Sequence, residues 1–263
     1  SSFTSNIFST EVGSSVDISW SSTNATSCTA SGSWTGPIST TGSKTVEIST
    51  AGESTFTLTC NGEGGNASRT ITIEGYRNIQ GVAVDGYISG ASIFIDTDSD
   101  YALDSNETST TSSTDGSFTI KYENGVLASL GGQDVDTQTQ LNNLLLLRDL
   151  SGYSESSFMV TPVTSVAHFM PSQDIYTVLG LDSDLDIYTT DPVANIGDGG
   201  GYDLLYEKGN QLTILAYSLQ NISNSLNSSM DSTADYFKAI SEEIVIAYTD
   251  NEATVNIEKD IFI

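Results

Sequence analysis

Acidic side chains outnumber basic ones by 34 to eight in this chain of 263 residues, which carries a single His and a net charge of −26. A compact chain with this charge repels itself, so it folds stably where salt or bound cations screen the repulsion. The same charge repels the phosphates of nucleic acids and an anionic membrane surface. We therefore expect no nucleic-acid partner and an extracellular protein, in seawater-like salt or in millimolar calcium.

Membrane insertion is not expected either. No apolar run approaches the roughly 18–20 residues that a membrane helix needs. No basic segment followed by an apolar one opens the chain, so we expect that a signal peptide has been removed.

Cys28 and Cys60 are the only cysteines, and both lie in segments with the periodicity of strands. Two thiols in a Ser/Thr-rich β region fit one disulfide, which forms in an oxidising compartment. The alternative is a pair of buried free thiols in a cytosolic protein. A single His with two Cys leaves no His/Cys metal cluster.

The first region, residues 1–76, contains short runs in which polar and apolar residues alternate. These runs, separated by turns that contain Gly, lie at 16–20, 45–48, 56–60 and 70–73. Short alternating strands at roughly ten-residue spacing predict a β-sandwich. The next region, residues 77–160, begins as a second β module, with strands expected at 81–89, 91–95 and 117–122.

An acidic loop in the second region has the spacing of a twelve-residue calcium site. The ligands predicted from this spacing are, in chain order, Asp96, Asp98, Asp100, the carbonyl of Ala102, Asp104 and Glu107. A hard cation needs six to eight oxygens, and alternate residues of a tight coil converge on one point. The alternative is a solvated acidic loop. We expect calcium in a structural role.

Tyr101 departs from the calcium-loop pattern, because it stands where the pattern prefers a Gly with positive φ. A Tyr in that conformation costs on the order of 1 kcal/mol. Asp134 and Asp136, in the run GGQDVD, are a second metal-binding candidate.

The third region, residues 161–263, changes to helical periodicity. Pro162 suits a first helical turn, and apolar residues then recur at spacings of three and four, as they do again in 202–226 and 231–248. The last residues, 255–263, alternate like a strand. The fold class expected is therefore α+β with three domains: a β-sandwich, a small calcium-binding β-sandwich, and a helical domain with a terminal strand. A strand left free at the end would either begin a further module or pair with a neighbouring copy, unless the tail folds back on its own helices.

Three stretches carry a resemblance to secreted bacterial surface proteins of the multi-module adhesin type. DISWSSTNATSCTASGSWTG with STFTLTCNGEGGNASRTITI resembles an immunoglobulin-like module, and this resemblance also implies a Cys28–Cys60 bridge. VDGYISGASIFIDTDSDYALDSNETSTTSSTDGSFTI is similar to calcium-loaded sandwiches of prealbumin-like topology, such as the B-type repeats of serine–aspartate surface proteins and carboxypeptidase-regulatory-like modules. VTPVTSVAHFM and the residues after it resemble a segment that often follows such modules.

Three functional classes compete on these observations. The chain contains no Gly-x-Ser-x-Gly, His-Glu-x-x-His or Cys/His pattern, so we expect that it is not an enzyme. The enzyme alternative is a glycosidase with a pair of carboxylates, which has no local motif. The first choice is a structural or adhesive module of a surface adhesin, filament or matrix, rigidified by calcium, whose partners are further copies or neighbouring surface modules. The alternative is a carbohydrate-binding accessory module of a secreted bacterial hydrolase, in which Trp34 or Trp20 stacks on a polysaccharide.

Overall fold

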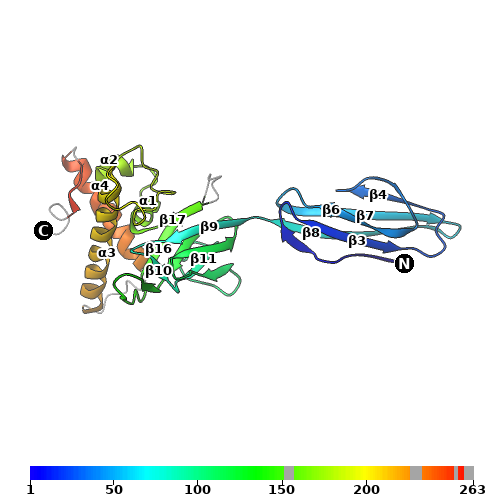
Figure 1. Ribbon diagram of the computed structural model, residues 1–263, viewed down its shortest axis with the longest axis horizontal. Helices are drawn as coiled ribbons and strands as arrows, with labels where there is room; N and C mark the ends of the chain where they lie inside the picture. The colour runs from blue at the N-terminus through cyan, green and yellow to red at the C-terminus, as the bar shows by residue number, and fades with distance from the viewer. Residues whose placement is uncertain (151–156, 226–232, 252–253, 258–263) are drawn as a thin grey trace. The chain divides into compact units, whose positions relative to one another are not determined.

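The computed structural model describes residues 1–150, 157–225, 233–251 and 254–257. The chain divides into two compact units, Ser1–Asn78 (unit 1) and Ile79–Ile263 (unit 2) (Figure 1). The architecture is α+β, with all four helices of the described residues in unit 2.

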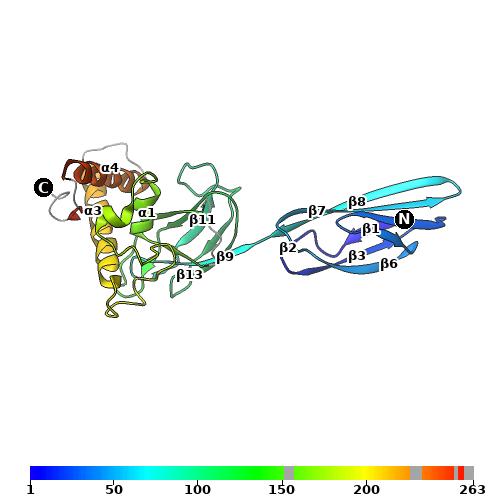
Figure 2. The same cartoon turned by 90° about the horizontal axis from the view of Figure 1, so that it is seen from above.

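Unit 1 consists of two sheets that enclose one apolar core (Figure 2). The smaller sheet has the order β1 (Ser2–Ser5), β3 (Ser15–Ser21), β6 (Thr41–Glu47). The larger sheet has the order β2 (Ser9–Glu11), β8 (Gly65–Tyr76), β7 (Gly52–Gly62), β4 (Ser27–Gly32), β5 (Gly36–Ile38). Strict alternation explains the packing, since Val16, Ile18 and Trp20 of β3 are buried and the residues between them are exposed. Two packed sheets of this kind form a sandwich.

Trp34 lies at the centre of the unit 1 core. Its ring stacks on Phe3 at 5.6 Å and meets Trp20 and Phe56 edge-on at 5.4 and 6.1 Å between centroids. Trp34 is only 4% exposed and Trp20 only 6%. Neither indole therefore presents a free face to a sugar, and the carbohydrate-binding alternative loses the side chains on which it depended.

The disulfide between Cys28 and Cys60 is present. The two residues are directly opposite each other on the neighbouring strands β4 and β7, so the bond ties two strands of one sheet. The bridge of antibody domains instead joins the two sheets. A disulfide indicates a non-cytoplasmic location.

The described residues of unit 2 form three sheets. The largest has the order β12 (Ser109–Thr111), β11 (Ser92–Asp96), β14 (Val126–Leu130), β16 (Leu145–Asp149). The other two are β13 (Ser117–Lys121), β9 (Asn78–Ala83), β17 (Ser157–Val160), and β10 (Ile88–Ser89) with β15 (Gln133–Asp134). The strand expected over 81–89 is thus divided into β9 and β10, because the chain turns at Asp85-Gly86, where Gly86 has φ +69° and Val84 pairs with Tyr87.

The helical region does not form a compact unit of its own. Helices α1 (Pro162–His168), α2 (Ile175–Leu179), α3 (Tyr202–Ser225) and α4 (Thr233–Asn251) share one core with the strands. Strand β16 shows why the strands need the helices. Leu145, Leu146 and Leu147 are all buried. Leu146 belongs to the core shared with the helices, whereas Leu145 and Leu147 belong to a second apolar cluster on the other face. A strand that is apolar on both faces needs cover on both. The boundary expected at residue 160 therefore lies inside unit 2.

The start of α1 follows the expected chemistry. Pro162 occupies the first turn, and Thr161 caps the helix through a reciprocal hydrogen-bond pair with Thr164.

The tail differs from the expected terminal strand. Residues 254–257 form no strand, and the Val255 amide donates a hydrogen bond to the Val178 carbonyl. Val255 and Ile257 are buried in the core of unit 2. These residues fold back on their own unit, whereas 258–263 lie outside the described residues. No helix in the described part of the chain is long and apolar enough to cross a membrane.

Candidate metal site

The acidic loop at 96–107 connects the antiparallel neighbours β11 and β12. It begins at Asp96, the last residue of β11, which is fully buried, and it ends at Glu107, which is 8% exposed. The carboxylates between these two, at Asp98, Asp100 and Asp104, are exposed. Strand pairing thus brings both ends of the loop together and sets two of its acids in the protein interior.

Backbone amides of the loop donate to its carboxylates in turn. The two oxygens of Asp96 accept from the amides of Ser99 and Tyr101 at 2.7 and 3.0 Å. The carboxylate of Glu107 reaches back to the amide of Thr97 at 2.8 Å. These bonds coil the loop tightly, as convergence on a cation requires.

Two groups of carboxylates in the loop offer ligand oxygens within 4.8 Å of one another. They are Asp96 with Asp98 and Glu107, and Asp98 with Asp100 and Asp104. Asp98 belongs to both. The structure therefore brings together all five acids that the spacing singled out, while the amide of Ala102 donates to Asp100 at 2.8 Å. Five acids on one coil repel one another, and Asp100 above all raises the pKa of Asp104. This oxygen-only donor set fits a hard divalent cation such as calcium.

The structure shows how Tyr101 fits a position that usually holds glycine in calcium loops. It has the positive φ that the position requires, +61°. Its ring packs edge-on against Phe169, which follows α1, at 5.7 Å between centroids, and its hydroxyl lies 3.4 Å from Nε2 of His168. Burial lowers the pKa of His168. These contacts favour the positive φ of Tyr101 and attach the loop to α1. In the sequence, the only sign of this attachment was a tyrosine at a position that usually holds glycine.

Asp134 and Asp136 belong to neither of these two groups of carboxylates. Asp134 instead accepts hydrogen bonds from the amides of Asp136 and Thr137 at 2.8 and 3.0 Å and so stabilises the turn after β15. Asp136 is exposed.

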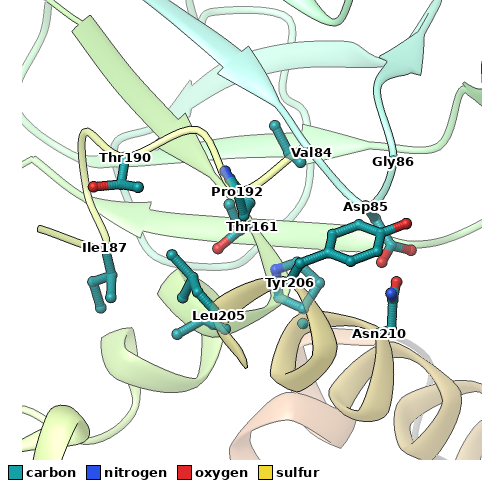
Figure 3. A pocket seen from close by; sticks show the side chains of 13 residues that line it. Val84, Asp85, Gly86, Thr161, Ile187, Thr190, Pro192, Leu205, Tyr206 and Asn210 are labelled. Carbon is teal, nitrogen blue, oxygen red and sulfur yellow. The ribbon is translucent and has the colours of Figure 1, made fainter. Parts of the chain in front are cut away.

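Asp85 is a titratable residue that the sequence did not single out. It lines a small apolar pocket between the Asp85-Gly86 turn and α3, beside Tyr206 and Asn210 (Figure 3). Desolvation by burial raises its pKa to about 6, although the Thr213 hydroxyl donates to it at 2.9 Å. The pocket holds about 20 Å³, room for roughly one water, so the arrangement is a polar contact between the β module and α3.

Comparisons with known proteins give little. No family model matches the chain, and no curated protein matches it. One solved structure, the three N-terminal domains of the bacteriophage RB49 highly immunogenic outer capsid protein (Hoc), overlaps 54% of this chain and 66% of its own length. The sequence identity is 12% and the TM-score 0.24, too low to establish a shared fold.

Proposed function

We propose that the chain is a non-enzymatic, extracellular structural or adhesive module, rigidified by calcium at the loop 96–107. It would serve in a surface adhesin, filament or matrix, with copies of itself or neighbouring surface modules as partners.

One observation carries the calcium proposal: Asp96 and Glu107 are buried carboxylates, and neither forms an ion pair with a described Lys or Arg. Burying an unpaired charge is costly, and buried charges are ordinarily paired or bound to a metal. A cation held by Asp96, Asp98, Asp100, Asp104 and Glu107 would supply the missing charge. Because the loop joins β11 to β12 and contacts α1 through Tyr101, binding there would stiffen unit 2.

The strand order of unit 1 supports an immunoglobulin-like type for the first module. Its first extended segment divides between the sheets, with β1 beside β3 and β2 parallel to β8. The remaining strands follow the two-sheet order known for immunoglobulin domains, with three strands facing a sheet centred on β7.

The test is the thermal stability of unit 2 at low ionic strength, with calcium and with a chelator. A ligand that binds only the folded state stabilises it by about 2.7 kcal/mol at a hundredfold excess over Kd. We expect Glu107→Gln to remove most of that gain, because it removes one charge and the paired oxygens of a bidentate ligand.

The matched control is Asp198→Asn, which removes one exposed carboxylate outside the loop. It should keep the full calcium response. Identical melting of the unaltered chain in calcium and in chelator would refute the calcium proposal.

A further inference from the structure

Unit 1 contains an open cleft of about 420 Å³ at the end where the β7–β8 hairpin turns. Its walls include Ser2 of β1, Asn24 in the β3–β4 connection, and Leu58, Cys60, Ala67 and Arg69 of the hairpin. The volume is in the range of binding pockets and far larger than the space beside Asp85.

The floor of the cleft is part of the inner face of the larger sheet, which is exposed at this end on β8. Residues opposite each other on antiparallel strands share a face, and the register pairs Leu58 with Arg69 and Cys60 with Ala67. Leu58 and Cys60 are 5% and 8% exposed, whereas Ala67 and Arg69 are exposed. The smaller sheet thus stops short of this end, and Arg69 occupies a core-facing position without being covered.

Contacts on the other face of the β7–β8 hairpin confirm that the side chain of Arg69 points into the cleft. There the hydroxyls of Thr57 and Thr70 lie 2.9 Å apart, and those of Thr59 and Ser68 lie 3.0 Å apart. Side chains alternate along a strand, so Arg69 points to the opposite face from its neighbours Ser68 and Thr70.

Strand β8 borders the cleft with an unpaired edge. It pairs with β7 along its length, but with β2 only at Glu74, Gly75 and Tyr76. Among the described strands, none pairs with the other edge over residues 65–73. A free strand edge beside an open cleft offers main-chain hydrogen bonds and side-chain pockets to an extended peptide.

The positive charge of Arg69 indicates which kind of extended peptide would bind in the cleft. Arg69 alone among the residues lining the cleft has a charged side chain, and it forms no ion pair with a described residue. Inward-pointing charges on an edge strand oppose the addition of uncharged apolar strands. A strand that brings a carboxylate to Arg69 would escape this penalty, so the same residue would reject one class of strand and accept another.

We propose that this cleft accepts an extended peptide segment of another polypeptide, added to the free edge of β8. Alternate side chains of the segment enter the cleft: a small apolar one contacts Ala67, and a carboxylate pairs with Arg69. The proposal does not depend on the calcium site, which belongs to unit 2.

The experiment uses the full chain and three blocked, fluorescently labelled peptides. The first is Thr-Val-Thr-Asp-Thr-Val-Thr, and the other two have Asn or Lys in place of Asp. We expect the Asp peptide to bind about tenfold more tightly than the Asn peptide, in fluorescence polarisation at low salt. Hydrogen exchange at 65–73 should slow when it binds.

Charge reversal gives the decisive comparison. Arg69→Glu should make the Lys peptide the preferred one, and Arg69→Gln should abolish the preference for the Asp peptide. Arg77→Glu, the same charge change at an exposed position outside the cleft, should leave the order of the peptides unchanged. If no peptide binds, or if all three bind equally to every variant, Arg69 only protects the edge and the proposal is wrong.

Discussion

The two units differ in their excess of acidic residues and in the interactions that stabilise them. Unit 1 has six acidic and three basic residues, whereas unit 2 has 28 acidic and five basic residues. Unit 1 has a disulfide between β4 and β7 and an aromatic core around Trp34. Unit 2 contains no Cys. Covalent and apolar interactions thus stabilise unit 1, whereas the calcium site proposed for unit 2 would make the stability of that unit depend on ions as well.

Unit 2 does not use all of its basic residues to balance the surface. Arg148 is fully buried, its guanidinium 4.2 Å from the ring centroid of Phe158 and 5.0 Å from that of Tyr188, and it donates to the Tyr188 carbonyl. Lys208 is 8% exposed. Among the described residues of unit 2, these two cationic side chains lie in the interior, as do the carboxylates of Asp96 and Glu107. Burial therefore leaves the excess of acidic residues at the surface unchanged.

The largest expected effect is on the core of unit 1. Trp34→Ala removes a ring that contacts Phe3, Trp20 and Phe56, and we expect a loss of about 3–5 kcal/mol. Hydrogen exchange followed unit by unit would measure it. Faster exchange should be confined to unit 1, and an unaltered exchange rate there would contradict the central place of Trp34.

Reduction of the disulfide should come next. For a loop of this length, chain entropy gives about 3.5–4 kcal/mol. We expect reductant to speed exchange in unit 1 and to leave unit 2 unchanged. Alkylation of two thiols in the unreduced, folded protein would show instead that the bridge does not form.

Asp85 provides a smaller effect, in unit 2 alone. Its pKa in the folded state is raised from 3.8 to about 6, so the folded state binds the proton more tightly than the unfolded state does. Stability contributed by the protonated form is therefore lost as pH rises from about 4 to about 6, by about 2–3 kcal/mol. Asp85→Asn should recover that amount at pH 7 and flatten this part of the stability curve, measured by urea unfolding. Asp198→Asn, at an exposed site, should do neither.

Salt should produce the smallest difference. Monovalent salt screens repulsion between surface charges, so raising NaCl in the presence of a chelator should stabilise unit 2 by on the order of 1 kcal/mol and unit 1 by less. Equal responses of the two units would mean that the charge difference has no energetic consequence.

Local pattern predicted much of this molecule. Alternation at 16–20 and 56–60 corresponds to β3 and β7, and helical spacing after Pro162 corresponds to α1. The spacing of acidic residues at 96–107 predicted the same carboxylates that lie close to one another in the structure. Each of these features depends on residues close in sequence, or on the period of one element.

Other features required contacts between distant residues. The spacing of Asp134 and Asp136 could not show that Asp134 stabilises its own turn, and the Trp residues could not show that both are buried.

The sequence alone was enough to predict the type of most elements and the acidic loop, because strand and helix periods and ligand spacing are local properties. It also left each cysteine only one possible partner, whereas the bridge itself is seen in the structure. The tertiary structure alone decided that strands and helices of unit 2 share one core, that Val255 and Ile257 join it, and that Arg69 faces an uncovered cleft. Those outcomes depend on which apolar surfaces cover one another, and such cover is set by packing between residues far apart in the chain.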